Sequence, residues 1–139
     1  MDLVLWRHAE AEDSEPDFER RLTGRGQKQA NQMAHWLKRH LPENYRLLVS
    51  PAKRTQQTAR ALSNRFEIVP ELAVGTSREA VLAASGWPHA KGTVVVVGHQ
   101  PSLGQVAAWL LGDVQSSWSV KKGAIWWLSS RVRHDHNQT

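Results

Sequence analysis

The chain has 139 residues, enough for one domain that buries about 70% of the surface its unfolded form exposes. It contains no cysteine, which excludes disulfides, zinc–thiolate sites and thiol nucleophiles and is typical of a reducing compartment. The formal net charge of +5 permits a nucleic-acid partner, but the basic residues are scattered and form no stripe with interleaved aromatics, so the pattern argues against one.

The N-terminus carries no basic leader, and nowhere does an apolar stretch reach the roughly 18 residues that a membrane span needs. We therefore expect a cytoplasmic protein without a membrane partner.

The N-terminal part of the chain predicts a strand, an acidic loop and a helix. Residues 3–6 are apolar throughout, as expected for a strand covered on both faces. The segment 10–19 carries six carboxylates and is expected to be a solvated loop, with the alternative that it flanks a binding site and favours basic partner surfaces. Thr23 can cap a helix whose apolar residues recur at helical spacing as far as Leu41.

The middle of the chain repeats this strand and helix alternation. Residues 46–49 predict a second strand. Ser50 is then a candidate N-cap, and Pro51 suits the first position of a helix over about residues 51–65. Residues 67–69 predict a short strand.

The next two units follow the same pattern. The motif Thr76-Ser77-Arg78-Glu79 has the form of a capping box that begins a helix over residues 78–84, which Gly86 ends. Four consecutive valines make residues 93–97 the strongest predicted strand. A helix follows from Pro101-Ser102 to Gly112.

The C-terminal part predicts one more strand, over residues 124–128, and a polar tail without regular structure. We expect a single domain over residues 1–130 and a tail over residues 131–139. His134 and His136 in this tail have no further clustered ligands, so no metal site is expected there. Alternation of strands and helices predicts an α/β fold, a three-layer α/β/α sandwich with a mostly parallel central sheet.

Histidine and arginine side chains follow three of the predicted strands. Arg7 and His8 end the first strand, Arg54 lies in the first turn after the second, and His99 follows the valine strand. The carboxyl ends of parallel strands and the N-termini of the helices after them meet at one edge of a sheet. Two imidazoles and two guanidiniums at one edge suit a phosphate dianion.

These residue types also suit phosphoryl transfer. A neutral imidazole can attack phosphorus in line and form a phosphohistidine that water hydrolyses, and His8 is the expected nucleophile. One of its ring nitrogens must then donate its proton to a nearby acceptor. His99, as a partly charged donor, would stabilise the transferring group, while Arg7 and Arg54 clamp its oxygens. No metal or cofactor is required, because the guanidiniums and helix N-termini supply positive charge.

The motifs around these residues resemble the histidine phosphatase superfamily, the phosphoglycerate-mutase-like group, across nearly the whole chain: Arg7-His8, Ser50-Pro51-x-x-Arg54-x-x-Gln57-Thr58-Ala59 and Gly98-His99-x-Pro101. Two more segments, together with the short length, resemble SixA-type phosphohistidine phosphatases most: Arg20-x-Leu22-Thr23-x-x-Gly26 and Lys122-Gly123-Ala124-Ile125.

The resemblance implies a phosphoglycerate-mutase-like fold in which the four strand-end residues form the phosphate pocket. His8 matches the residue that is phosphorylated, and Arg20 matches a further phosphate-binding arginine. Ala9 departs from the family motif, which has glycine at this position and so permits backbone angles that a Cβ restricts.

The general acid of the mutases and many phosphomonoesterases has no convincing match here, and Glu71, Glu10 and Asp13 are the candidates. An alkoxide leaving group needs a positioned proton, worth about 10²- to 10⁴-fold in rate, whereas an imidazole needs far less help. We therefore expect a phosphohistidine phosphatase whose partner is a phosphohistidine-containing signalling or phosphotransfer protein. The alternatives are a small-molecule phosphomonoesterase on the same fold and a non-catalytic phospho-ligand binding module.

Tryptophan is frequent, with seven residues in the chain. Trp6, Trp36 and Trp109 fall on strand or helix faces that are expected to be core. Trp126 and Trp127 are neighbours on a predicted strand and must point to opposite faces of it. Ordinary packing is the expected role of these side chains, with a protein contact as the alternative.

Overall fold

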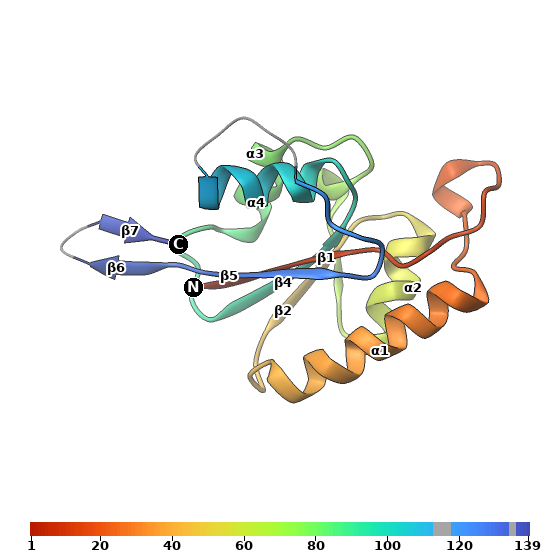
Figure 1. Ribbon diagram of the computed structural model, residues 1–139, viewed down its shortest axis with the longest axis horizontal. Helices are drawn as coiled ribbons and strands as arrows, with labels where there is room; N and C mark the ends of the chain where they lie inside the picture. Colours follow the sequence, from red (N-terminus) through yellow and green to blue (C-terminus); the bar gives the residue numbers. More distant parts are fainter. Residues whose placement is uncertain (113–117, 134–135) are drawn as a thin grey trace.

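A five-stranded sheet lies at the centre of the computed structural model, which describes residues 1–112, 118–133 and 136–139 (Figure 1). Its strand order is β3-β2-β4-β1-β5, with β1 (Asp2–Arg7), β2 (Arg46–Val49), β3 (Glu67–Ile68), β4 (Thr93–Gly98) and β5 (Ile125–Ser129). The main helices are α1 (Gly24–His40), α2 (Lys53–Leu62), α3 (Arg78–Ser85) and α4 (Ser102–Gly112).

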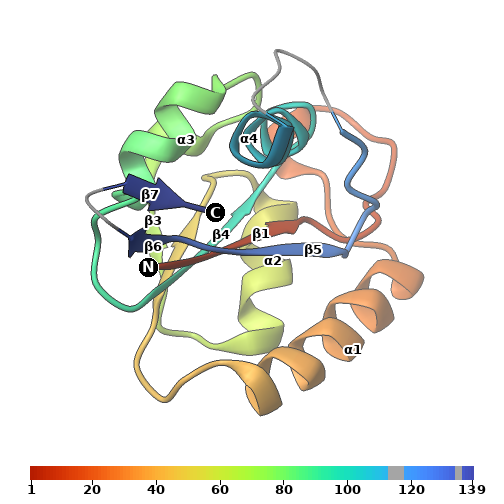
Figure 2. The ribbon, with the colours of Figure 1, turned by 60° about the vertical axis from the view of Figure 1, so that its left-hand side comes forward.

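Helices cover both faces of this sheet. Figures 1 and 2 show α1 and α2 on one side and α3 and α4 on the other. β1, β2, β3 and β4 run parallel to one another, whereas β5 pairs antiparallel with β1 at the edge of the sheet. The predicted three-layer α/β/α sandwich with a mostly parallel sheet is therefore confirmed.

The continuous apolar run of β1 divides between two cores. Leu3 and Leu5 pack in the cluster that includes α4, while Val4 and Trp6 pack in the cluster that includes α1 and α2. All four side chains are buried. Burial on both faces is what positions β1 at the centre of the molecule and its carboxyl end at the rim, where the polar residues begin.

The tryptophans divide in a similar way. Trp126 packs with the α4 side of the sheet and Trp127 with the α1 side, so the predicted opposition of these neighbours is confirmed. Trp6 is buried, but Trp36 on α1 is 41% exposed, and the prediction that it belongs to the core is wrong. Its ring contacts the edge of the Trp127 ring without being covered by another element of the described chain.

The predicted helix starts are confirmed for α1 and corrected for α2. Thr23 caps α1 by accepting a hydrogen bond from a backbone N–H of the first turn. α2 begins at Lys53 rather than at Pro51, and its N-cap is not Ser50, because the Ser50 hydroxyl is engaged by His99.

The predicted capping box at the start of α3 does not form. Ser77 is the N-cap and accepts from the backbone N–H of Ala80, while the Glu79 carboxylate pairs with Arg78 instead of returning to the cap. Gly86 ends the helix as predicted, in the left-handed conformation with φ of 77°.

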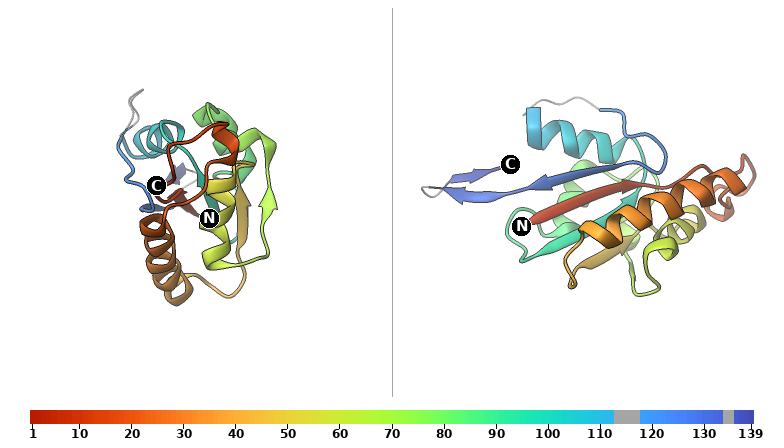
Figure 3. Two further views of the ribbon diagram at one scale, coloured as in Figure 1. Left: turned by 90° about the vertical axis from the view of Figure 1, so that its right-hand side faces the viewer. Right: turned by 60° about the horizontal axis from the view of Figure 1, so that its bottom comes forward.

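The C-terminal residues, expected to lack regular structure, form an antiparallel pair of short strands, β6 (Arg131–Arg133) and β7 (His136–Gln138). The backbone N–H of Ser130 donates to the carbonyl of Met1, and the two termini lie near one another (Figure 3). His134 lies outside the described residues. None of the helices in the described ranges is long and apolar enough to cross a bilayer.

Gly26 in the first turn of α1 offers a direct test of this packing. An added Cβ would overlap the backbone carbonyl of Glu10, whereas a Cβ at Gly24, two residues earlier, would meet open space among the described residues. We expect Gly26→Ala to lower the free energy of unfolding by about 1–3 kcal/mol, as overpacking does. Chemical denaturation of both variants measures this, and equal stability of Gly26→Ala and Gly24→Ala would contradict the described contact.

Candidate active site

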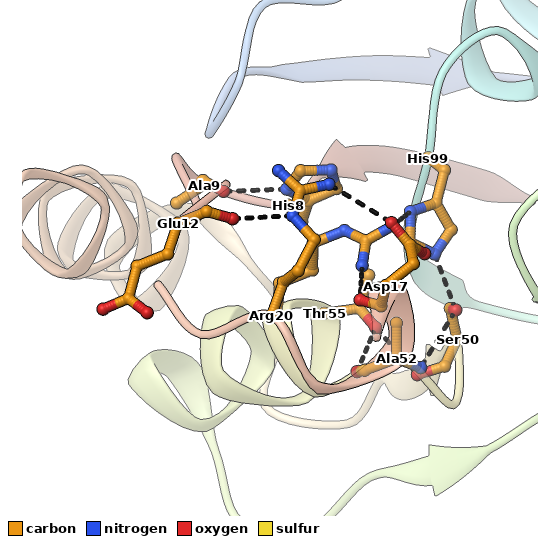
Figure 4. A network of polar contacts seen from close by, with 10 residues as sticks. His8, Ala9, Glu12, Asp17, Arg20, Ser50, Ala52, Thr55 and His99 are labelled. Carbon is orange, nitrogen blue, oxygen red and sulfur yellow. Dashed lines mark hydrogen bonds and ion pairs between the residues drawn. The ribbon is translucent and has the colours of Figure 1, made fainter. Parts of the chain in front are cut away.

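The polar residues that follow β1, β2 and β4 converge at one end of the sheet (Figure 4). The rings of His8 and His99 have centroids 5.4 Å apart, and Nη2 of Arg54 lies 3.5 Å from Nδ1 of His99. All three residues are nearly buried, with exposed fractions of 6%, 3% and 3% for His8, His99 and Arg54. The predicted meeting of three strand ends in one place is what the structure shows.

The orientation of the His8 ring is fixed by a backbone carbonyl. Nδ1 of His8 lies 2.7 Å from the carbonyl oxygen of Ala9, and because a carbonyl only accepts, Nδ1 carries the proton. Burial, together with the charges of Arg54 and Arg7, lowers the pKa of His8 to about 4, although the hydrogen bond to the Ala9 carbonyl acts in the opposite direction. His8 is therefore neutral at pH 7, with a lone pair on Nε2.

Ala9 is itself held on both sides. Its backbone N–H donates to Oγ1 of Thr58 at 3.1 Å, and the Thr58 hydroxyl donates to the carbonyl of Arg54 at 2.8 Å. The methyl group of Ala9 is buried in an apolar cluster with Ala11, Leu22 and Ala30. The Cβ that distinguishes it from glycine is thus accommodated in the core.

His99 is fixed in the opposite tautomer. Its Nδ1 faces a guanidinium nitrogen of Arg54, which only donates, so Nδ1 is unprotonated and Nε2 donates to Oγ of Ser50 at 2.7 Å. Burial, together with the neighbouring His8 and Arg54, lowers the pKa of His99 to about 3. His99 is therefore neutral in the free pocket, because a cation buried beside guanidiniums is disfavoured; the partly charged donor expected beside a phosphate stays a prediction.

The two guanidiniums present donors that no described group accepts. Arg7 Nη1 donates to the carbonyl of Val120 at 2.9 Å, and Arg54 Nη1 donates to the carbonyl of Asp17 at 2.8 Å. The Nε atoms of Arg7 and Arg54 are buried and have no hydrogen-bond partner among the described residues. Since an unmet buried donor is costly, an anion with several oxygens suits this pocket.

The acidic segment is exposed over residues 12–19, and one of its carboxylates contacts the pocket. Its short 3-10 turn, Asp17–Glu19, places Oδ2 of Asp17 3.2 Å from Arg54 Nη2 and Oδ1 3.3 Å from Arg20 Nη1. Of the two interpretations of this segment, its position beside the site is supported at Asp17, and the segment is also solvated, since the Asp17 side chain is 53% exposed. Arg20 reaches the mouth of the pocket through this contact.

Asp17 is ionised in this arrangement. Its slight burial opposes ionisation, but the charge and hydrogen bond of Arg54 and those of Arg20 lower the pKa of the carboxyl below its usual value. Asp17 therefore supplies negative charge at the pocket and no proton at neutral pH.

The carboxylates considered as general acids lie elsewhere. Glu71 lines a separate hollow with Arg46, and the Glu10 carboxylate accepts from the Thr23 hydroxyl at 2.7 Å. Asp13 is exposed, and no contact with the pocket is among the described interactions of any of the three.

The sequence did not identify Asp17 or the hydroxyl of Ser50 as parts of the site. A signal for Ser50 was present, because it directly follows β2, which ends at the same edge of the sheet as β4, the strand before His99.

Comparisons with known proteins agree with this geometry. A family model of the histidine phosphatase superfamily (branch 1) matches residues 3–75. A phosphohistidine phosphatase SixA homolog of Haemophilus influenzae is 33% identical over 128 residues, which cover 81% of this chain and 78% of that protein. Phosphohistidine phosphatase SixA of Escherichia coli K12 is 32% identical over 119 residues, which cover 78% of this chain and 73% of that protein.

A solved structure shows the same likeness in three dimensions. The protein histidine phosphatase SixA complexed with tungstate matches with a TM-score of 0.70 at 27% identity, covering 93% of this chain and 97% of that chain. The chain is thus similar to these proteins in sequence and in fold.

The ring state of His8 is directly measurable. In a long-range ¹H–¹⁵N correlation spectrum at neutral pH, we expect the neutral tautomer protonated on Nδ1, and we expect it to persist as the pH falls through the ordinary value of 6.5 toward about 4. The same ring in the urea-unfolded chain should titrate near its ordinary value, about 6.5. A folded-state midpoint near 6.5, or protonation on Nε2 alone, would contradict the geometry.

Proposed function

The chain belongs to the histidine phosphatase superfamily and is a phosphatase, and we propose that it removes phosphoryl groups from phosphohistidine side chains of signalling or phosphotransfer proteins. One observation carries the proposal: the hydrogen bond between His8 Nδ1 and the Ala9 carbonyl leaves the other ring nitrogen free, beside the buried guanidinium of Arg54 and the half-buried side chain of Arg7. The relatives named as phosphohistidine phosphatases support the substrate class.

The reaction proceeds in two displacements. Nε2 of His8 attacks phosphorus in line as the phosphorus–nitrogen bond of the substrate breaks, and the bonding electron pair passes to the substrate imidazole, which takes a proton from solvent. His8 then carries the phosphoryl group. In the second step water attacks phosphorus, inorganic phosphate leaves, and the electron pair returns to Nε2 of His8.

The cations of the pocket hold the transferring group through both steps. In this proposal the guanidiniums of Arg7 and Arg54 bind phosphoryl oxygens, and Arg20, which contacts Asp17, adds positive charge at the mouth. A bound dianion raises the pKa of the nearby His99 above its value in the free pocket, so this ring becomes a stronger donor when substrate is present.

The ionised state of Asp17 supports a phosphorus–nitrogen over a phosphorus–oxygen substrate. Among the described carboxylates, Asp17 is the one that contacts the pocket, and its lowered pKa makes it a poor proton donor. An alkoxide leaving group needs such a donor, whereas an imidazole leaves with far less help. The pocket is therefore better matched to phosphohistidine than to an alcohol ester.

The nucleophile is tested by trapping the intermediate. When incubated with a radiolabelled phosphohistidine-bearing domain, the native protein should acquire an acid-labile, alkali-stable label and release inorganic phosphate. His8→Ala should do neither, because the lone pair on Nδ1 of His99 faces Arg54, and His35→Ala on the exposed side of α1 should behave as native.

Two results would reject this function. Brisk hydrolysis of sugar phosphates with no action on phosphohistidine proteins would indicate a small-molecule phosphomonoesterase. Equilibrium binding of phosphate with no turnover of phosphohistidine or aryl phosphates would indicate a binding module.

The role of Arg54 as a fixed positive charge is tested by removing the charge. We expect Arg54→Gln to reduce turnover by about 10²- to 10³-fold, the effect of losing a preorganised donor at a developing charge. Arg60→Gln, two turns later on the exposed side of α2, is the matched control and should change turnover by less than about twofold. Native-like turnover by Arg54→Gln, with unchanged thermal stability, would show that the clamp is not required.

A further inference from the structure

An apolar groove lies beside the catalytic pocket, between α1 and the edge strand β5. Its volume is about 620 Å³, and its apolar walls are formed by Met33 and Trp36 from α1 and by Ile125 and Trp127 from β5. Figure 2 shows α1 on one face of the sheet, and the side chain of Trp127 from β5 packs on that same face. The groove therefore lies beside α1 on this face, over the edge strand β5, which no helix of the described chain covers there.

Aromatic side chains in this groove are exposed and already ordered. Trp36 is 41% exposed, its ring stacks on His40 with centroids 3.9 Å apart, and it packs edge-to-face with Trp127, with ring centroids 6.1 Å apart. A large apolar side chain held in one orientation at the surface loses little conformational freedom on binding, which is typical of the anchor residues of protein interfaces.

One end of the groove is joined to the backbone of the catalytic loop. The N–H of Gly123 in its floor donates to the carbonyls of Arg7 and His8, both at 3.1 Å. Oε1 of Gln29 in its wall accepts from the N–H of Glu10 at 3.0 Å. A partner bound in the groove therefore lies next to the loop that carries His8.

The rim at this end is basic. Lys121 and Lys122 line it and are exposed, and no carboxylate is among the described residues that form its walls. A second copy of the chain carries the same net charge of +5, so electrostatics disfavour self-association here and favour an acidic partner.

We propose that this groove binds an amphipathic helix of the phosphohistidine-bearing partner, with its apolar stripe on Trp36 and Trp127 and its acidic residues on Lys121 and Lys122. A helix fits because packed helices lie about 8–10 Å apart, so one placed beside α1 would cover β5 as α1 covers its neighbours. This docking deepens the proposed function and rests on it. It gives the enzyme a preference for phosphohistidine within a folded protein over the free amino acid.

Steady-state kinetics with two substrates test the docking. The probes are a helical histidine-phosphotransfer domain of the same organism, phosphorylated with phosphoramidate, and free phosphohistidine. The measured quantity is the ratio of kcat/KM for the domain to kcat/KM for the free amino acid. Trp36→Ala and the double variant Lys121→Glu/Lys122→Glu should each lower this ratio by about tenfold or more, as loss of an interface anchor or reversal of a rim charge does.

A matched charge reversal keeps the comparison specific. Lys38→Glu/Lys91→Glu changes the net charge equally, and both lysines are exposed and lie outside the groove lining. Its ratio should equal that of the native protein. Because all the substituted side chains are exposed, a thermal melt of each variant should match the native one.

The outcomes separate the docking from the function. Hydrolysis of both substrates with an unchanged ratio in the groove variants would overturn the docking and leave the proposed function standing. Failure of the native protein to hydrolyse either substrate would reject the proposed function. A native dimer in sedimentation that Trp36→Ala converts to monomer would assign the groove to a second copy and overturn the docking of a partner helix.

Discussion

The hydrogen bond between Nδ1 of His8 and the carbonyl of Ala9 determines which nitrogen of the ring can act on phosphorus. It is sustained by a relay from α2, because Thr58 binds the backbone N–H of Ala9 and donates to the carbonyl of Arg54. Ala9, which orients the proposed nucleophile His8, and Arg54, the proposed phosphate-binding residue, are thus coupled through one hydroxyl. The central strand β1 also contributes, because its burial on both faces fixes the position of its carboxyl end, after which His8 follows directly.

Burial and the neighbouring cations both keep the two imidazoles of this pocket neutral, the state in which His8, the proposed nucleophile, has a free lone pair. The buried guanidinium of Arg54 is partly compensated by the carboxylate of Asp17. The Asp17 carboxylate is 53% exposed, so this ion pair is weak compensation for a buried cation. A phosphate dianion brings more charge and more acceptor oxygens to the same place, and this is why the free pocket is primed for it.

The strand ends were predictable from the sequence because their signals are local: continuous apolar runs, followed at once by Arg7-His8, by Arg54 and by His99. The side-chain partners were not predictable, since they depend on long-range contacts. Ser50 has the form of a helix cap but is bonded to His99 across two strands. Asp17 is one acid among six in its segment, and only the fold shows that it meets Arg54. Trp36 lies at a core-like spacing on α1, yet β5 is the last strand of the sheet and leaves it exposed.

The central claim, that the free Nε2 of His8 attacks phosphorus, is tested most directly by identifying the phosphohistidine isomer in the trapped enzyme. Heteronuclear NMR of the phosphorylated protein distinguishes phosphorus on Nε2 from phosphorus on Nδ1, and proteolysis with mass spectrometry locates the residue. The hydrogen bond to Ala9 predicts a single phosphoryl group, on Nε2 of His8. Phosphorus on Nδ1 of His8, or on His99, would contradict it.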